Sequence, residues 1–155
     1  MRKVSGILIL IIVAAMPLMI VSCSPEACFE ETNAYLKASL YLNETKKLKA
    51  PDSLTLYGIN IPSAKIYDRA SKVQPALFPL NPSSGTCSFI IKINGITDTI
   101  QFVYSSYPHL ISKECGYTFY HELDTFYYSK NAIDYIYRGN NRITTLNEEN
   151  LRIFY

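Results

Sequence analysis

The sequence predicts an all-β fold: an antiparallel two-sheet β-sandwich of the immunoglobulin-like kind, with seven or eight strands, after an N-terminal signal helix. Three observations support this prediction. Short runs of alternating apolar and polar residues recur throughout residues 32–155, and this period is typical of a strand with one buried face. Turn-forming residues separate the runs at short intervals, as in sandwiches. The chain also contains 13 tyrosines and 7 phenylalanines, which favour strands over helices.

The start of the chain has the three parts of an export signal. Residues 1–22 combine a basic beginning, an apolar stretch and a small residue at the cleavage point. Because Cys23 follows, the quartet Ile20–Cys23 is lipobox-like and predicts cleavage before a lipidated cysteine. We expect acyl chains on Cys23, palmitate among them, to hold the mature protein on a membrane. Two alternatives remain: an uncleaved membrane helix over Val4–Val21, and a secretory signal cut elsewhere.

The predicted organisation has three parts: a signal peptide (1–22), a lipidated tether (23–31) and a single β-sandwich domain (32–155). The full sequence has 15 basic and 13 acidic residues. The signal contains the basic residues Arg2 and Lys3 and no acidic residue, so the mature chain is neutral. A neutral surface lacks the positive charge that dominates binding to phosphates, and we therefore expect no nucleic-acid binding.

The first predicted strand is Tyr35–Leu42, where apolar side chains on one face alternate with more polar ones on the other. Two shorter strands are predicted at Leu54–Tyr57 and Lys65–Tyr67, with turn residues between them. Residues 69–85 contain several prolines and a Ser-Ser-Gly run. Since proline cannot donate to a strand ladder, this stretch is predicted to be a loop or a broken sheet edge.

The clearest local element is a hairpin over Thr86–Tyr107. Apolar residues alternate on both sides of Asn94-Gly95, and these two residues accept the positive φ angles of a type I′ turn. Later strands are predicted at Tyr117–Leu123, Ile133–Arg138 and Asn150–Tyr155.

With Cys23 assigned to lipid, Cys28, Cys87 and Cys115 remain. The export signal places them where disulfides persist, and three cysteines allow at most one bridge within the chain. We predict a bridge between Cys28, which ends the tether, and Cys115, which lies in a polar turn. It would close a loop of roughly 90 residues and contribute about 4 to 5 kcal/mol at most in the chain-entropy model. Cys87 alternates with apolar residues and is interpreted as a buried free thiol. The alternative is that all three are reduced.

Five segments spread along the chain carry a family resemblance: Cys28–Thr32, Leu77–Asn81, Asp98–Tyr104, Ser112–Tyr117 and Asn150–Tyr155. Their most specific piece is the cysteine-glycine-aromatic step that begins at Cys115. Together they resemble an uncharacterised lipoprotein family of Bacteroidota-type bacteria, a domain of unknown function. The resemblance covers nearly all of the mature chain. It implies a β-rich lipoprotein of the outer membrane, on either the periplasmic or the surface face, and it implies no reaction.

The same resemblance implies two modification sites. Asp52-Ser53-Leu54 and Asp98-Thr99-Ile100 match the pattern that such bacteria O-glycosylate outside the cytoplasm. Ser53 and Thr99 are therefore candidate O-glycosylation sites. The alternative is that both segments are ordinary strand or turn sequence.

The sequence lacks the motifs of common catalytic and metal sites. It has no Gly-x-Ser-x-Gly elbow, no His-Glu-x-x-His, no Asp-rich calcium loop and no Cys-x-x-Cys. His121 alternates with aromatic and apolar residues and is interpreted as a strand histidine, and His109 follows Pro108 in a predicted loop. We expect no enzymatic activity, no cofactor and no metal.

Tyrosines gather in the last third of the chain, and they are the strongest functional signal in it. Exposed tyrosine offers rigid contact area with a hydrogen-bonding tip. We select Tyr120, Tyr127 and Tyr128 as candidate binding residues for a protein or a sugar. The absence of tryptophan counts modestly against a sugar-binding platform. The alternative is that tyrosines such as Tyr135 and Tyr137 simply cover a sheet face.

These observations favour a non-enzymatic cell-envelope lipoprotein that binds a protein partner, or serves as a structural module, at the outer membrane. The first alternative is a glycan-binding envelope lipoprotein, whose retention on glycans should weaken when Tyr127 or Tyr128 is changed to alanine. The second is an enzyme, which would require a cleft that gathers His109 or His121 with acidic side chains.

Overall fold

The computed structural model describes residues 27–155. The predicted signal peptide and Cys23 therefore lie outside the described residues, as does most of the tether. Within residues 27–155, no helix is long and apolar enough to cross a membrane.

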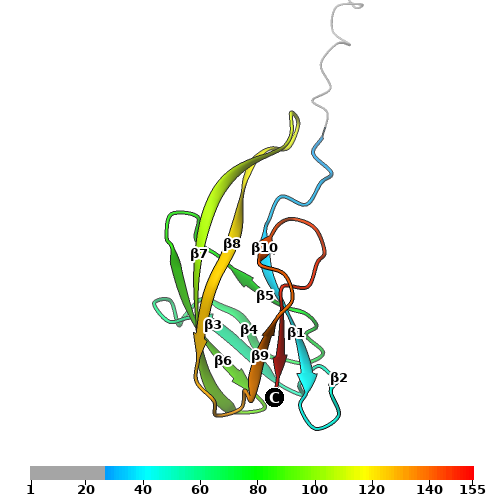
Figure 1. The fold of residues 1–155 in the computed structure, drawn as a ribbon, viewed down its shortest axis with the longest axis vertical. Coiled ribbons are helices and arrows are strands. Elements are labelled where there is room, and N and C mark those ends of the chain that lie inside the picture. The colour runs from blue at the N-terminus through cyan, green and yellow to red at the C-terminus, as the bar shows by residue number, and fades with distance from the viewer. Residues whose placement is uncertain (1–26) are drawn as a thin grey trace, which may run out of the picture.

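The described residues form two packed β-sheets and contain no α-helix, which confirms the predicted fold class (Figure 1). Their strands are β1 (Tyr35–Leu42), β2 (Lys47–Leu48), β3 (Leu54–Gly58), β4 (Lys65–Ala70), β5 (Ala76–Pro79), β6 (Thr86–Ile93), β7 (Ile96–Ser112), β8 (Gly116–Tyr128), β9 (Tyr135–Arg138), β10 (Arg142–Ile143) and β11 (Leu151–Phe154). The count exceeds the predicted seven or eight because β2 and β10 have two residues each, and because β5 forms inside the predicted loop.

The smaller sheet has the order β2-β1-β11-β9, with β5 beside β1. β1 and β11 are parallel, so the sandwich is not antiparallel throughout. Asn150 helps to set this pairing: its Oδ1 accepts from the Lys37 backbone N–H at 2.9 Å, and its own N–H donates to the Lys37 carbonyl at 2.9 Å. The last strand is thereby held beside the first predicted strand.

The larger sheet has the order β10-β8-β7-β6-β3-β4. The predicted hairpin is confirmed as β6 and β7, joined by Asn94 at φ 49° and Gly95 at φ 90°. The Asn94 N–H donates to the Ser53 carbonyl at 2.9 Å, and so the turn is also tied to the loop before β3. Positive φ at both turn residues is the geometry for which Asn-Gly is favoured.

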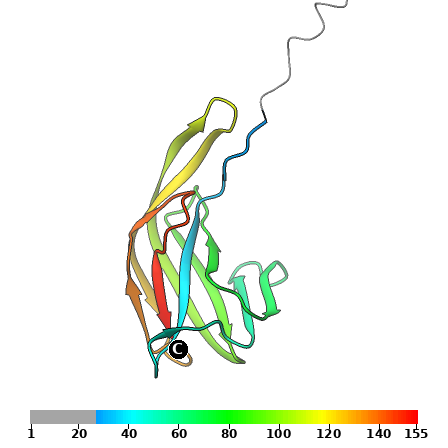
Figure 2. The ribbon, with the colours of Figure 1, turned by 90° about the vertical axis from the view of Figure 1, so that its right-hand side faces the viewer.

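β7 and β8 continue far past the residues where the sequence predicted strand ends. They pair from Ile100↔Tyr128 out to Ser112↔Gly116. We call residues 105–122 the arm, because this part of the hairpin projects beyond the sandwich next to the N-terminal segment (Figures 1 and 2). The C-terminus lies at the opposite end of the molecule.

The tip of the arm is bound to the N-terminal segment. The predicted disulfide between Cys28 and Cys115 is present, with a Cα–Cα distance of 4.8 Å and a sequence separation of 87. A second connection lies nearby, where the Thr118 hydroxyl donates to the Thr32 carbonyl at 2.6 Å. Residues 28–32 therefore run beside the arm rather than away from it.

The core lies between the two sheets and is filled mostly by Leu, Ile and Phe. Phe78 of β5 packs edge-on against Phe89 and Phe102, with ring centroids 5.3 Å apart in both pairs. Edge-to-face packing is a favourable arrangement for aromatic rings. Burial of Phe78 explains why a strand forms within a proline-rich stretch, since the side chain fills the centre of the core.

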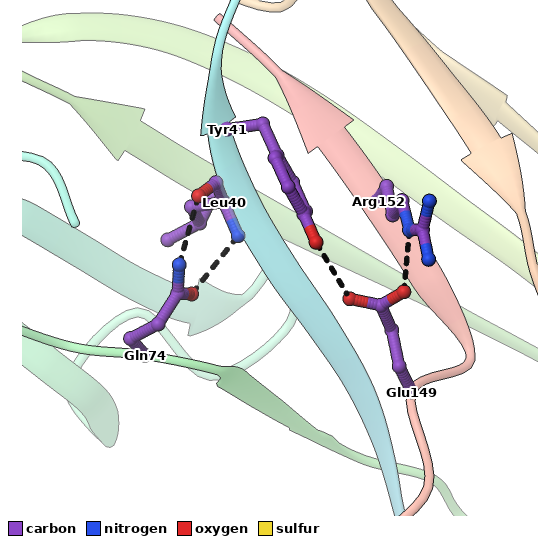
Figure 3. Close-up of polar contacts among 5 residues, drawn as sticks. All are labelled: Leu40, Tyr41, Gln74, Glu149 and Arg152. Atoms are coloured by element: carbon purple, nitrogen blue, oxygen red, sulfur yellow. Dashed lines mark hydrogen bonds and ion pairs between the residues drawn. The ribbon is translucent and has the colours of Figure 1, made fainter. Parts of the chain in front are cut away.

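Gln74 completes the ladder along β1 between β5 and β2. Its side-chain amide accepts from the Leu40 N–H at 2.9 Å and donates to the Leu40 carbonyl at 2.8 Å (Figure 3). The side chain thus bonds Leu40 between the residues of β1 that pair with β5 and those that pair with β2, and the Leu40 carbonyl also accepts from the Lys49 N–H at 3.0 Å.

Candidate functional site

The described residues form an apolar groove beside the start of β6. Its volume is about 690 Å³, which is within the range of pockets that bind ligands. We define this groove by its apolar lining: Ile59, Ile61, Ile66, Leu80 and Phe89. Ile61 is 59% exposed, so a large aliphatic side chain at the rim faces water.

The groove exists because β3 and β6 separate. Their pairing ends at Gly58↔Phe89, and the chain then turns away from β6. Two backbone hydrogen bonds form this turn: the Ile61 N–H donates to the Gly58 carbonyl at 3.0 Å, and the Ala64 N–H donates to the Ile61 carbonyl at 3.1 Å. The opposite wall, Pro79–Asn81, follows β5, which pairs with β1 in the other sheet. The groove is therefore an opening between the two sheets.

Backbone groups along the groove are largely paired within the protein. The Ser84 hydroxyl donates to the Thr86 carbonyl at 2.8 Å and accepts from the Thr86 N–H at 3.2 Å. The Ser88 carbonyl accepts from the Ile59 N–H at 3.0 Å. An occupant would therefore be recognised mainly by side-chain contact and not by addition of a strand.

One end of the groove is polar. The Cys87 sulfur lies 2.9 Å from the Tyr104 hydroxyl, which also donates to the Asn81 carbonyl and accepts from the Asn81 N–H, both at 2.9 Å. Burial, together with the hydrogen bond from Cys87, raises the pKa of Tyr104 far above its ordinary value. The phenol therefore stays protonated and serves as a structural donor. Cys87 is a free, half-buried thiol, somewhat more exposed than the predicted buried one.

The three predicted binding tyrosines do not form one surface. Tyr120 lies on the arm, where its ring stacks on His109 with centroids 4.1 Å apart and its hydroxyl meets the Thr145 hydroxyl at 3.1 Å. Tyr127 lies further along β8 and is 61% exposed. Its neighbour Tyr128 is half-buried among the side chains next to the core. Whether any of them binds a ligand stays a prediction.

A tighter aromatic cluster lies on the smaller sheet, at residues that were not selected as candidates. Phe154 stacks between Tyr41 and Tyr135, with ring centroids 5.2 and 4.3 Å away. The Arg152 guanidinium lies 5.6 Å from the centre of the Tyr41 ring and 5.7 Å from that of Tyr137. The sequence showed that Tyr135 and Tyr137 share a strand face, but their position beside Tyr41 depends on the parallel β1–β11 pairing.

Glu149 orients the charged part of this cluster. Its carboxylate accepts from Arg152 Nε at 2.5 Å and from the Tyr41 hydroxyl at 3.4 Å (Figure 3). Although burial raises the pKa of Glu149, hydrogen bonds from Ser39, Arg152 and Tyr41 and the charge of Arg152 lower it by more, so the pKa lies below its usual value. The guanidinium is thereby held over the tyrosine rings.

The histidines are not brought together with acidic side chains. His121 is buried, and its Nδ1 lies 2.8 Å from the Ser106 hydroxyl. His109 is exposed and stacks on Tyr120. The hydrogen bonds of the described residues include none between His121 and a carboxylate, so the Ser106–His121 pair lacks the orienting group of a catalytic triad. Residues 27–155 contain no cluster of three potential metal ligands.

The two predicted glycosylation residues lie in strand surroundings. Ser53 is half-buried and its N–H donates to the Asn94 side chain at 3.1 Å. Thr99 is half-buried in β7, and its N–H donates to the Ser129 hydroxyl at 2.9 Å. Glycosylation at either position stays a prediction.

The acidic residue before Thr99 has a structural role. Asp98 is buried, and its carboxylate accepts from the backbone N–H groups of Asn131, Ala132 and Ile133 at 2.7 to 2.9 Å and from the Ser129 hydroxyl. Burial raises the pKa of Asp98, but these hydrogen bonds outweigh it and lower the pKa below its usual value. Asp98 thereby fixes the turn between β8 and β9.

Comparison with known proteins yields one match. A family model described as "Family of unknown function (DUF6452)" matches residues 53–155. No curated protein matches, and no solved structure matches. The matched region starts just before β3 and so includes the groove, the arm and the C-terminal strand.

Proposed function

Because this chain belongs to a family of unknown function, DUF6452, we propose its role from its own surfaces: it is a non-enzymatic lipoprotein of the cell envelope that binds a protein partner through the apolar groove. In this proposal the acyl chains on Cys23 hold it on the outer membrane of a Bacteroidota-type bacterium. The anchor is supported by the export signal and lipobox-like quartet at the start of the chain, and the outer membrane and the bacterial group are implied by the family resemblance.

The exposed apolar lining of the groove carries the binding part of the proposal. Ile59 and Ile61 extend into water from the loop after β3, although the molecule has a well-filled core that buries aliphatic side chains of the same kind. Exposed apolar residues that converge on one hollow are typical of interaction sites. The paired backbone along the groove favours an apolar side chain of the partner as the inserted group.

Site-specific photocrosslinking in isolated membranes tests the proposal. A photoreactive residue at Ile61 should give one defined crosslinked protein, whereas the same residue at Leu146, which is 60% exposed on another loop, should give none. The protein identified is then purified, and its affinity is measured for the wild type and for Ile61→Asp. The aspartate charge would lie in an apolar contact, so it should weaken binding of the partner by about tenfold or more. A tenfold loss of affinity corresponds to about 1.4 kcal/mol.

Lipidation is measured on the same material. Mass spectrometry of the N-terminal peptide should show an acylated Cys23, and Cys23→Ala should leave the chain unprocessed or release it from the membrane. Equal crosslinking from positions 61 and 146, or an unmodified Cys23 in the membrane fraction, would contradict the proposal.

Glycan binding is the second candidate, and the aromatic cluster of the smaller sheet favours it. Tyr137 is exposed beside the oriented guanidinium of Arg152, and sugars are commonly bound by aromatic faces next to polar groups. A glycan array should show specific retention that Tyr137→Ala weakens and that Tyr117→Ala does not, since Tyr117 is exposed on the arm, away from this cluster. Loss in both variants, or in neither, would argue against this site.

A further inference from the structure

The inner face of the arm is apolar and lacks a facing sheet. β7 and β8 keep one register from Tyr104↔Leu123 to Leu110↔Tyr117, with Pro108 opposite Phe119, and the register shifts only between Leu110 and Ser112 at the tip. Closer to the sandwich, the next two residues of β8 on the same face are His121 and Leu123, and both are buried. On the arm, Leu110 is 47% exposed, Phe119 44% and Tyr117 74%.

The N-terminal segment adds another apolar side chain at the tip. Phe29 is 92% exposed, and it lies one residue from the disulfide that joins Cys28 to Cys115. Phe29 also lines a hollow of about 290 Å³ together with Ser112 and Glu114 of the arm. Four large apolar or aromatic side chains therefore gather at this end of the molecule: Phe29, Leu110, Tyr117 and Phe119.

The disulfide limits how far this end can be from the lipid anchor. Cys23 precedes Cys28 by five positions, a stretch that spans at most about 18 Å when fully extended. Because the Cα atoms of Cys28 and Cys115 are 4.8 Å apart across the disulfide, the arm tip must stay within about 23 Å of the acylated residue. Residue 27, the first that the structure describes, lines the hollow at this exposed apolar end.

We propose that the tip of the arm lies in the membrane interface, with Tyr117, Phe119, Leu110 and Phe29 contacting the lipid headgroup region beside the acylated Cys23. This inference rests on the proposed lipid anchor and extends it, because the bilayer becomes a binding surface for the folded domain. The domain would then stand on the membrane in one orientation and not swing freely on its tether.

The chemistry of the tip fits a lipid interface. Tyrosine and phenylalanine have the apolar rings that favour the boundary between headgroups and acyl chains, and the tyrosine hydroxyl can bond there to water or headgroups. The turn carries Lys113 and Glu114, and Glu30 and Glu31 follow Phe29 in the N-terminal segment. Because acidic groups outnumber basic ones here, contact would depend on apolar side chains and not on anionic lipid. An apolar contact next to an acyl anchor supplies the second signal that strengthens membrane attachment.

A tryptophan probe can test this placement directly, because the chain contains no tryptophan. The full lipidated protein carrying Tyr117→Trp is reconstituted into phosphatidylethanolamine and phosphatidylglycerol vesicles, with and without brominated phosphatidylcholine. The emission of the probe should shift to the blue on reconstitution and lose intensity in brominated vesicles. Tyr127→Trp is the matched control, since Tyr127 is 61% exposed but lies on β8 away from the arm. Its emission should change in neither way.

Flotation of the same samples separates this inference from the anchor. Protein that does not float with the vesicles would show that the anchor itself is absent. Protein that floats while the probe at 117 behaves like the probe at 127 would overturn the membrane contact and leave the anchor intact. A blue shift that needs added membrane proteins would assign the arm to a protein partner and would also overturn the inference. Leu110→Trp provides a second probe if Tyr117→Trp does not fold.

Discussion

At the scale of single residues, the polar groups buried in this protein are satisfied locally and serve the fold. Among the described residues, no buried side-chain nitrogen or oxygen lacks a hydrogen-bond partner. Asp98 and Tyr104 show why: each binds backbone groups of a turn or loop. Buried polar residues such as Asp98 and Tyr104 therefore use their hydrogen-bonding groups to hold the fold. Binding to another molecule is left to the exposed side chains.

His121 gives the protein a pH dependence that can be measured. Burial lowers the pKa of His121 in the folded state, whereas in the unfolded chain it protonates near its ordinary value of about 6.5. The unfolded state therefore binds more protons as the pH falls through this region, and folding stability decreases. We expect the melting temperature of the wild type to fall between about pH 7.5 and pH 5.5.

Two substitutions isolate this effect. His121→Asn keeps a polar atom near Ser106 but cannot titrate, so its melting temperature should change much less over the same pH range. The neighbouring variant Ser106→Ala, which removes the hydroxyl 2.8 Å from His121 Nδ1 but keeps the histidine, should still lose stability as the pH falls. Carboxylates with lowered pKa values, Asp98 and Glu149, titrate below this window. Parallel slopes for wild type and His121→Asn would refute the assignment.

At the scale of elements, side chains bond backbone groups that gaps between strands leave open. Gln74 occupies the gap beside β1, and Ser84 caps the first residue of β6. Both act where the backbone of a neighbouring strand has turned away. Backbone groups that would otherwise lack a partner are thereby paired within the protein.

The bond between Gln74 and β1 should matter for stability. Gln74→Ala leaves the N–H of Leu40, a fully buried residue, without a partner, while the Leu40 carbonyl keeps the bond from the Lys49 N–H, and we expect a loss of about 1 to 3 kcal/mol in the free energy of unfolding. Gln101→Ala, which changes an exposed glutamine in β7, should cost less than about 0.5 kcal/mol. Urea denaturation measures both. If the two variants had the same midpoint, the side-chain bridge would have no net energetic role.

At the scale of the whole molecule, the disulfide joins the chain's entry point to the most extended element. The N-terminal segment is bonded to the arm, and the C-terminus lies at the other end (Figure 2). The groove lies on the side of the sandwich, where the loop after β3 faces the end of β5. A molecule that stands on its arm tip would leave the groove accessible to a partner.

The disulfide should also stabilise the fold. Its sequence separation of 87 means that the bridge restricts the unfolded chain strongly, and we expect Cys28→Ser with Cys115→Ser to lose about 2 to 4 kcal/mol in unfolding free energy. A reducing agent should shift the unfolding midpoint of the wild type toward that of the variant and leave the variant unchanged. Identical midpoints in oxidised wild type and variant would rule out this contribution.

Short-range signals predicted the elements that depend on neighbouring residues. The Asn94-Gly95 hairpin and the alternating strand Tyr35–Leu42 are present where the sequence placed them, because turn chemistry and side-chain alternation act within a few residues. The pairing of Cys28 with Cys115 was also predicted, since cysteine arithmetic left few alternatives. By contrast, β5 lies in the stretch predicted to be a loop or a broken sheet edge, because the prolines there obscure a short strand that is held by the burial of Phe78.

The surfaces proposed for binding depended on contacts between distant parts of the chain. The groove forms because the chain separates from β6 after β3 and because β5 pairs with β1 in the other sheet. The aromatic cluster depends on the parallel pairing of β11 with β1. The arm depends on the pairing of Tyr107–Leu110 with β8. None of these pairings has a local signature, since the partner of a strand is chosen by total burial across the sandwich. Strand period and turns were therefore readable from the chain alone, whereas the exposed faces emerged only when its strands were assembled.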